Sequence, residues 1–295
     1  MKNIYMTGGD GQDGIILTSI FSKKKNFKLF LLKKNFKKGS IYSSINLRTI
    51  YSKKIDKYLK KNKPHILIHL AAKNPSYREY SKKKFYNDNL SFSVKLFKKV
   101  YEVNPCVKII FTNSSQVFSK REGVVNEKSK TRVSSDYTKF RLETVKYLIK
   151  KKINFMNVIL FNHDSIFRNK KFLLPRLIKA IKLKRIKFIQ KIIDLNISAD
   201  FSHAEDICNG IYKLAITSRK IQDIILSSNK RTSVNNIIKY ILNKNSLELK
   251  LNFKSRKKNP NSLIGSNKKA KKLLNWRPKK NIYIAANEIY KKIKI

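Results

Sequence analysis

A glycine turn near the N-terminus restricts the fold of this chain more than any other feature. Gly8, Gly11 and Gly14 lie three residues apart, after the apolar run 3–6 and before residues 15–21, whose apolar side chains recur at helical spacing. The first Gly permits a tight turn, the second lets backbone N–H groups approach a pyrophosphate, and the third lets the helix pack on the strand. Since the chain has only 8 Gly, three of them between a strand and a helix predict a dinucleotide-binding site.

Apolar runs and helical stretches alternate after this turn. The runs that predict buried strands lie at residues 27–32, 66–70, 107–112 and 155–161. Helical stretches lie between them, including residues 91–102 and 137–151. This alternation predicts an α/β fold, a Rossmann-type doubly wound parallel sheet covered by helices on both faces.

The alternation weakens after residue 161, which indicates a smaller C-terminal lobe. No Gly/Ser-rich or Pro-rich linker and no internal repeat separates the two parts, so we expect them to be interleaved. The predicted cofactor-binding domain comprises residues 1–163 and 201–230. The predicted substrate-binding lobe comprises residues 164–200 and 231–295.

The charge of the chain is strongly positive, with 68 Lys and Arg against 18 Asp and Glu and a formal net charge of +50. Clustered basic residues neutralise nucleic-acid phosphates, but here they are scattered along the whole chain and Lys greatly outnumbers Arg. We interpret the charge as the surface of an ordinary protein from a low-GC genome, with no nucleic-acid partner. A nucleic-acid-binding protein is an alternative that rests on the charge alone.

Several features predict a cytoplasmic protein without a membrane partner. The glycine turn begins at residue 8, too early for a signal peptide, and no apolar run approaches the roughly 18 residues that span a bilayer. Cys106 and Cys208 lack C-x-x-C spacing, and the four His lack the spacing of metal ligands. We therefore expect a reducing compartment and no metal.

The end of the second predicted strand indicates the type of cofactor. An acidic residue at this place would hold the ribose 2′-hydroxyl of NAD, whereas the chain has Lys33 and Lys34. Two cations suit the 2′-phosphate of NADP, so we predict NADP. The alternative is that both are surface lysines in a lysine-rich chain.

A candidate catalytic group follows the central strands. Ser114 comes directly after the run 107–112, and Tyr137 begins a predicted helix on which Arg141 lies four residues further along the same face. A hydroxyl and a phenol together can polarise a substrate alcohol, and a nearby cation stabilises the phenolate. The pattern is typical of a hydride-transfer site.

Five collinear motifs give the chain a resemblance to a known family. They lie at residues 7–14 (TGGDGQDG), 69–73 (HLAAK), 161–165 (FNHDS), 200–206 (DFSHAED) and 265–278 (GSNKKAKKLLNWRP). With these motifs the chain resembles the GDP-mannose 4,6-dehydratase family of extended short-chain dehydrogenases/reductases, also described as NAD-dependent epimerases/dehydratases. The resemblance covers nearly the full length.

The resemblance implies a nucleotide-sugar lyase of polysaccharide biosynthesis, with NADP as cofactor, a GDP-hexose as substrate and a homo-oligomeric state. Ser114 and Tyr137 fall on the family's catalytic Ser/Thr and Tyr, and Gln116 and Arg141 complete the catalytic positions. The implied cofactor-binding positions outside the three Gly are Gln12, Asp13, Lys33, Lys34, Leu70, Ala71, Ala72, Tyr137 and Arg141. The implied substrate-binding positions are Asn162, His163, Arg168 and Arg176.

Three positions depart from the family pattern. Gln116 stands where the family has a Glu base, Arg141 where it has Lys, and Ala199 where it has Arg. An amide cannot accept a proton at neutral pH, and Arg differs from Lys in reach and cannot relay protons. Two alternatives to a dehydratase therefore stay open: an NAD(P)-dependent reductase or epimerase of a nucleotide-linked 4-keto sugar, which needs no Glu, and a relative that binds without turnover.

Three further side chains have a structural interpretation beside a functional one. His203 fits a hydrogen-bonded structural histidine better than an acid or base, and His163 fits substrate contact and packing equally. Lys139 lies two residues after Tyr137, on another face of the helix, so we expect it to be solvated rather than to replace the missing Lys.

Overall fold

The computed structural model describes residues 1–33, 43–46, 53–72, 83–254 and 262–293. The chain divides into two compact units, which are described separately. The first comprises residues 1–117, 131–159 and 208–224, and the second comprises residues 118–130, 160–207 and 225–295.

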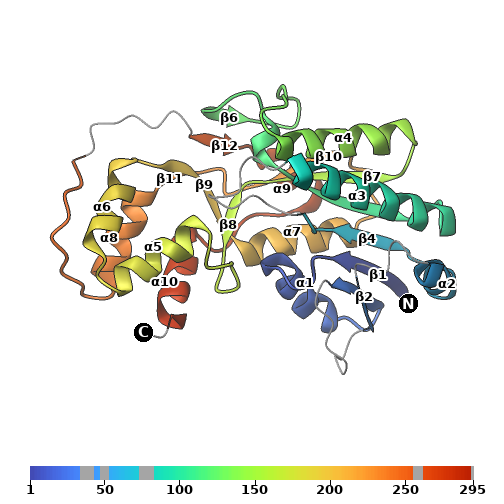
Figure 1. The fold of residues 1–295 in the computed structure, drawn as a ribbon, viewed down its shortest axis with the longest axis horizontal. Helices are drawn as coiled ribbons and strands as arrows, with labels where there is room; N and C mark the ends of the chain where they lie inside the picture. The colour runs from blue at the N-terminus through green and yellow to red at the C-terminus, as the bar shows by residue number, and fades with distance from the viewer. Residues whose placement is uncertain (34–42, 47–52, 73–82, 255–261, 294–295) are drawn as a thin grey trace. The chain divides into compact units, whose positions relative to one another are not determined.

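A seven-stranded sheet forms the centre of the first unit within the described ranges (Figure 1). Its strands, in spatial order, are β10 (Asp223–Leu226), β7 (Phe155–Leu160), β5 (Lys108–Ser114), β4 (Ile66–His69), β1 (Lys2–Thr7), β2 (Phe27–Lys33) and β3 (Ser43–Asn46). The pairs from β5 to β3 are all parallel. The chain reverses its direction of build-up on either side of β1, so the carboxyl ends of β1, β4 and β5 meet at one edge.

Helices cover both faces of this sheet, as its largely apolar strands require. Tyr5, Leu67 and Ile109 pack into a core with three helices, α2 (Lys53–Lys61), α3 (Lys83–Val103) and α4 (Asp136–Lys150). The neighbouring residues Ile4 and Ile68 point to the opposite face and are equally buried. Two further helices of this unit are α1 (Gln12–Ser22) and α7 (Ala204–Ile216), which meet through a ring contact between Phe21 and Tyr212.

The predicted fold class is confirmed. Strands occur at each of the runs that predicted them, and helices occur at both predicted helical stretches. Helix α3 begins at Lys83, eight residues before the predicted start at residue 91. The sequence does not predict this first part of the helix because the polar residues Asn87, Asp88 and Asn89 interrupt the apolar spacing.

The second unit combines short strands with a group of helices (Figure 1). One sheet has the order β11 (Arg231–Ser233), β9 (Ser198–His203), β8 (Asn162–Asp164), with β8 parallel and β11 antiparallel to β9. A parallel pair joins β6 (Gly123–Val125) to β12 (Leu263–Gly265). The helices α5 (Leu173–Lys182), α6 (Ile186–Asp194), α8 (Val234–Lys244) and α10 (Ile282–Lys292) share one apolar core, and α9 (Lys268–Leu274) follows β12.

The predicted substrate lobe, residues 164–200 and 231–295, lies wholly within the second unit. That unit also includes residues 118–130, 160–163, 201–207 and 225–230. The strand pairs β6–β12 and β8–β9 account for much of this difference, because they join the added segments to residues 262–265 and 198–203. The assignment of a cofactor role to one part and a substrate role to the other stays a prediction.

Candidate functional site

The glycine turn between β1 and α1 has the conformation that its sequence predicts. Gly8 adopts a positive φ of +74°, and a Cβ built there would lie 3.1 Å from the backbone nitrogen of Ala71. A Cβ on Gly14 would lie 2.2 Å from the carbonyl oxygen of Gly8, so the helix packs directly on the turn. A Cβ on Gly11 would lie 3.3 Å from the same oxygen. Gly8 and Gly14 are therefore required by the protein itself, whereas Gly11 is not.

This turn fits the pyrophosphate of a dinucleotide. Gly11 is the N-cap of α1, with φ −83° and ψ 168°, and no side chain caps the helix. A phosphate at this N-terminus would meet the positive end of the α1 dipole, and the second Gly leaves space for it to approach the backbone. Gln12 is buried and donates through its Nε2 to Asp13 Oδ1 at 3.2 Å, so these two side chains brace each other.

A buried histidine connects the glycine turn to the next strand. The hydroxyl of Thr7, at the end of β1, accepts the backbone N–H groups of Leu70 and Ala71 at 3.1 and 3.0 Å. Its proton therefore goes to His69 Nδ1, 3.0 Å away, and His69 Nε2 pairs with the Ser93 hydroxyl at 2.9 Å. The segment that contains the predicted cofactor positions Leu70 and Ala71 is thus fixed by a histidine that sequence reasoning did not single out.

The same histidine is held in its neutral form. His69 is fully buried, and its pKa falls to about 3 because burial penalises the charged ring and the nearby Arg141 guanidinium repels it. The neutral ring accepts at one nitrogen and donates at the other, as its two partners require. The motif HLAA was the available signal, but only the fold brings Thr7 and Ser93 to the two ring nitrogens.

Tyr137 and Arg141 form the centre of the candidate site. Both side chains are buried, and Arg141 Nη2 donates to the Tyr137 hydroxyl at 2.9 Å. Arg141 Nη1 donates to the backbone oxygen of Thr112, near the end of β5. The guanidinium also lies over the rings of Phe111, Tyr137 and Phe140, at 5.5, 5.0 and 5.0 Å. The predicted contact across one helical turn is present, and it holds the phenol oxygen against a permanent cation.

Helix α4 begins in a way that fixes Tyr137. Ser135 is the N-cap, its hydroxyl accepts the Thr138 N–H, and the Thr138 hydroxyl accepts the Ser135 N–H in return. This capping box defines the first turn, on which Tyr137 lies. Lys139 is exposed and its Nζ lies 5.0 Å over the ring of Tyr86, so it does not replace the missing Lys.

Ser114 and Gln116 lie at the carboxyl end of β5, on segments that pack against α4. Ser114 is partly exposed and its Oγ accepts the Gln116 N–H at 3.3 Å. Gln116 is exposed, in the short 3-10 helix η2 (Ser115–Val117).

A series of hydrogen bonds leads from β1 through His69 and Thr112 to Arg141 and Tyr137. Thr7 bonds to the His69 ring, and the Thr112 hydroxyl donates to the His69 oxygen at 3.0 Å. Arg141 then donates to both the Thr112 oxygen and the Tyr137 hydroxyl.

The two lysines that predict the cofactor type are placed only in part. Lys33 is the last residue of β2, and Leu32 pairs with Thr7, so the end of β2 lies beside the glycine turn. Lys34 lies outside the described residues, and the Lys33 side chain is likewise not described. Ala72 follows β4 and is partly buried against the core shared with α2, α3 and α4.

The four predicted substrate residues belong to the second unit. Asn162 is exposed on β8 and its Nδ2 donates to the Asp200 oxygen at 3.3 Å. His163 is buried, with Nδ1 2.7 Å from the Phe161 oxygen. Arg168 lies 3.7 Å over the ring of Phe172 and its Nε is 3.3 Å from Asp164 Oδ1.

Arg176 is partly buried on α5, with its guanidinium 5.3 Å over the Phe188 ring. His203 fits the structural interpretation: it is fully buried, its Nδ1 accepts the Glu205 N–H at 3.2 Å, and its Nε2 is 3.1 Å from Glu288 Oε2. It therefore links the start of α7 to α10.

Asp200 is a further buried acid of the second unit. Its carboxylate accepts the Ser228 N–H and hydroxyl at 2.8 and 2.6 Å, the Asn229 N–H at 3.0 Å and the Gly265 N–H at 3.2 Å. Burial nevertheless raises the pKa of Asp200 to about 6, because desolvation of the charge outweighs these four hydrogen bonds. The acid holds β9, the turn at residues 228–229 and β12 together.

The described ranges contain neither a metal-binding group nor a membrane-spanning helix. They hold no group of three or more His, Cys, Asp or Glu side chains that could bind a metal ion. None of the helices within them has the length and apolar content needed to cross a bilayer. Cys106 and Cys208 form no disulfide.

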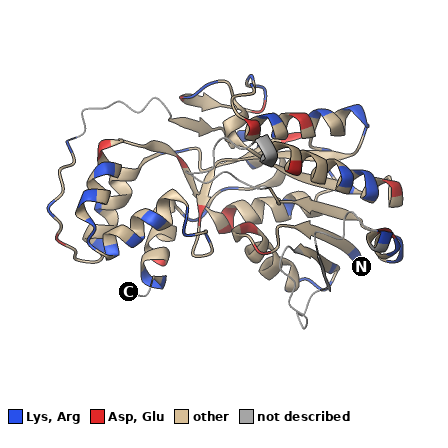
Figure 2. Cartoon of the chain, viewed as in Figure 1, with Lys and Arg blue, Asp and Glu red and all other residues tan. Residues whose placement is uncertain are grey.

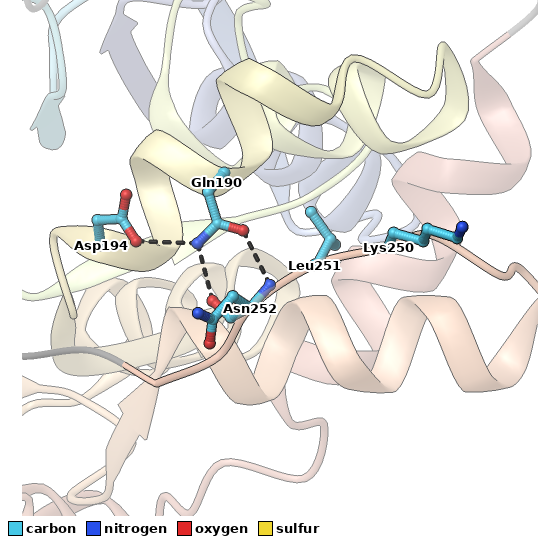
Figure 3. A pocket seen from close by; sticks show the side chains of 5 residues that line it. All are labelled: Gln190, Asp194, Lys250, Leu251 and Asn252. Atoms are coloured by element: carbon cyan, nitrogen blue, oxygen red, sulfur yellow. Dashed lines mark hydrogen bonds between the residues drawn. The ribbon is translucent and has the colours of Figure 1, made fainter.

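A surface depression in the second unit is lined by Gln190, Asp194, Lys250, Leu251 and Asn252 (Figure 3). Gln190 Nε2 donates to Asp194 Oδ1 at 2.9 Å and to the Asn252 oxygen at 2.8 Å, and its Oε1 accepts the Asn252 N–H at 2.9 Å. The amide thereby fastens residues 250–252 to α6. No predicted site residue lines this depression, so we assign it a structural role.

Comparison with solved structures shows which fold the chain has. UDP-glucuronic acid 4-epimerase from Bacillus cereus, in complex with NAD, matches with a TM-score of 0.81 at 17% identity, over 99% of this chain and 100% of that one. dTDP-glucose 4,6-dehydratase from Bacillus anthracis, also in complex with NAD, matches with a TM-score of 0.81 at 14% identity, over 99% of this chain and 96% of that chain. RMD from Pseudomonas aeruginosa, complexed with NADPH, matches with a TM-score of 0.78 at 15% identity, over 99% of this chain and 97% of that chain. The fold is that of the extended short-chain dehydrogenases/reductases.

The family is given by the sequence itself. The family model described as GDP-mannose 4,6 dehydratase matches residues 6–289. The chain belongs to this family, within the nucleotide-sugar epimerases and dehydratases, as its motifs predict. No curated protein matches the sequence.

Proposed function

We propose that this protein is a nucleotide-sugar 4,6-dehydratase that acts on GDP-mannose with NADP as its cofactor. The hydrogen bond from Arg141 to the Tyr137 hydroxyl carries the proposal, because it puts a buried phenol under a fixed positive charge at the edge of a dinucleotide-binding sheet. The family membership supports the reaction class. We further propose a cytoplasmic location and a homo-oligomeric state.

The chain's own residues supply the proton chemistry. The Tyr137 oxygen would take the proton from the C4 hydroxyl of the sugar, and Arg141 would stabilise the resulting phenolate. The Ser114 hydroxyl would hold the same sugar oxygen from the end of β5. When bound, the nicotinamide cofactor accepts hydride from the sugar and later returns it.

Tyr137→Phe tests this role. The substitution removes one hydroxyl and leaves the ring in place, so turnover of GDP-mannose should fall by roughly 10²–10⁴-fold, the usual worth of a positioned acid or base. Cofactor affinity, measured by calorimetry, should change little. Tyr86→Phe is the matched control, since Tyr86 lies in the same unit under Lys139 and has no part in the proposed chemistry. Unchanged turnover in Tyr137→Phe would contradict the assignment.

The basic pair Lys33 and Lys34 supports NADP over NAD. Charge-assisted contacts to a 2′-phosphate are worth roughly 1.5–3 kcal/mol each, so NADP should bind more tightly. A double variant, Lys33→Asp with Lys34→Ala, should narrow or reverse the ratio of the two affinities. Equal affinities of the parent protein for NAD and NADP would show that the pair is ordinary surface lysine.

Gln116 favours a second candidate function. With an amide in place of the family's Glu, hydride transfer at C4 needs no change while elimination loses its base. The reaction would then be that of a reductase or epimerase on a nucleotide-linked 4-keto sugar, or binding without turnover. Gln116 is exposed at the carboxyl end of β5, so a Glu there would need no rearrangement of the core.

Incubation with GDP-mannose and NADP, followed by mass spectrometry of the sugar, separates these functions. Loss of one water supports the dehydratase. No loss of water, together with retained binding of both ligands, supports the second candidate. In that case Gln116→Glu, alone and combined with Arg141→Lys, should raise dehydration by at least about tenfold, the gain expected from restoring a base.

A further inference from the structure

A row of polar side chains, buried at Asn113 and Asn157 and partly buried at Asp223, crosses three strands of the central sheet and ends at Ser114. Asp223, at the start of β10, accepts a hydrogen bond from Asn157 Nδ2 at 2.7 Å. Asn157, on β7, accepts in turn from Asn113 Nδ2 at 3.0 Å. Asn113, on β5, accepts the backbone N–H of Ser114 at 2.7 Å. The exposed fractions of Asn113 and Asn157 are only 4% and 6%.

The direction of these hydrogen bonds is fixed at both ends. The Ser114 N–H can only donate, and the Asp223 carboxylate, when ionised, can only accept. Two amides between a donor and an acceptor have one consistent arrangement, with each oxygen toward Ser114 and each nitrogen toward Asp223. Turning either amide would put two nitrogens or two oxygens against each other.

Such a row costs conformational freedom and buries polar atoms, so its members must all be paired. Apolar residues would fill positions 113 and 157 more simply, as they do at Ile109 and Val158 on the same strands. What the amides add is a fixed acceptor next to the Ser114 N–H. That acceptor sets the backbone direction at the last residue of β5, from which the Ser114 hydroxyl extends.

We propose that Asn157, anchored by Asp223, is a positioning residue for Ser114 and acts through Asn113. The inference rests on the proposed function, since Ser114 is there the group that holds the sugar oxygen. Asn157 touches neither Ser114 nor any predicted ligand contact in the described hydrogen bonds.

An exchange of side chains between two positions tests this proposal. Asn157→Asp alone removes the amide that donates to Asp223 and puts two carboxylates against each other at positions 157 and 223. Their repulsion should move the side chain at position 157 away from Asn113. Asp223→Asn added to it restores a full row, because the new amide donates to the new carboxylate, which still accepts from Asn113. Asn157→Ser is a second disrupting variant that adds no charge. Asn104→Leu is the control, since Asn104 is also buried in the first unit but bonds to Pro64 and Cys106.

Hydrogen–deuterium exchange at the Ser114 amide, followed by NMR, is a readout that needs no activity. Exchange should become about tenfold faster in Asn157→Asp and in Asn157→Ser, which is the worth of one neutral hydrogen bond. It should return to within about threefold of the parent in the exchanged pair, and should not change in Asn104→Leu. Unchanged exchange in Asn157→Ser, or no recovery in the exchanged pair, would overturn the proposal.

Kinetics then connect the row to the reaction. With GDP-mannose, kcat should fall about tenfold in the disrupting variants while KM changes little, and kcat should recover in the exchanged pair. A parent protein that turns over no nucleotide sugar would refute the proposed function and leave the amide exchange to decide the positioning role. A kcat that falls equally in Asn104→Leu would show a general loss of stability and overturn the specific role.

Discussion

At the scale of single residues, the neutral state of His69 makes folding sensitive to acid. Its pKa in the folded protein is about 3, whereas an exposed histidine titrates near 6.5. Below pH 6.5 the unfolded chain gains a proton that the folded protein does not bind, so stability is lost as the pH falls toward 3. At roughly 1.4 kcal/mol per pKa unit, the free energy of unfolding should drop by about 2 kcal/mol between pH 7 and pH 5.

Urea unfolding at both pH values, in the parent and in His69→Gln, measures this contribution. The difference between the two proteins in the loss of unfolding free energy on acidification isolates the contribution of His69 from that of Asp200. The raised pKa of Asp200, about 6, makes the unfolding free energy change with pH in the opposite direction. Asp200 binds its proton more readily in the folded state, so its contribution falls as the pH rises from about 4 to 6. An equal loss of stability on acidification in both proteins would contradict the role of His69.

Residues of the candidate site differ in how far sequence reasoning could reach them. Tyr137 and Arg141 were accessible because four residues of helix fix their contact in advance. His69, Asn157 and Asp223 were not, because their partners lie on neighbouring strands and the pairing of strands is not written in local spacing. The polar residues inside apolar strands were the only signal, since a buried polar group needs a partner.

At the scale of elements, the glycine turn permits a comparison of two equal substitutions. In Gly14→Ala the new Cβ would meet the Gly8 oxygen at 2.2 Å, so the turn or the helix must move. We expect a loss of more than about 3 kcal/mol in the free energy of unfolding, beyond the usual cost of overpacking. In Gly11→Ala the nearest backbone atom is 3.3 Å away and φ is negative, so the fold should be kept.

Gly14→Ala should affect stability more than Gly11→Ala does, whereas Gly11→Ala should weaken cofactor binding without loss of the fold. Gly11→Ala should weaken NADP binding at least about tenfold in calorimetry, because the methyl group takes the place where the pyrophosphate approaches the backbone. Thermal unfolding without cofactor is the control for folding. Unweakened binding in Gly11→Ala, or equal destabilisation by both variants, would refute this division of roles between the glycines.

Element boundaries show why the second unit was less predictable than the first. Strands β8, β11 and β12 each have three residues, too few to display an alternating pattern. Asn267 is the N-cap of α9, but its side chain does not cap the helix and instead donates to the Ser227 oxygen at 3.1 Å. Tertiary partners decide such short segments.

At the scale of the whole molecule, the acidic residues show how a chain of this charge folds. Two of them accept hydrogen bonds from backbone N–H groups: Asp206 from Lys279 and Lys280 at 2.8 and 2.6 Å, and Glu127 from Ile225 at 3.0 Å. Lys and Arg are distributed over the helices of both units (Figure 2). Asp206 and Glu127 thus lie where the fold needs an acceptor.

The net charge of +50 predicts an unusual response to salt. Folding brings these charges closer together than they are in the unfolded chain, and the repulsion opposes the compact state. Raising the ionic strength from 0.1 M to 1 M shortens the screening length from about 10 Å to about 3 Å, so added NaCl should stabilise the fold and raise Tm by several degrees. Surface ion pairs such as Lys98–Glu102, at 3.8 Å, and Lys280–Glu205 are worth at most about 1 kcal/mol each and are weakened by the same screening. Thermal unfolding in a salt series decides between the two effects, and a Tm that falls with added salt would mean that ion pairs, rather than repulsion, dominate the electrostatics of this protein.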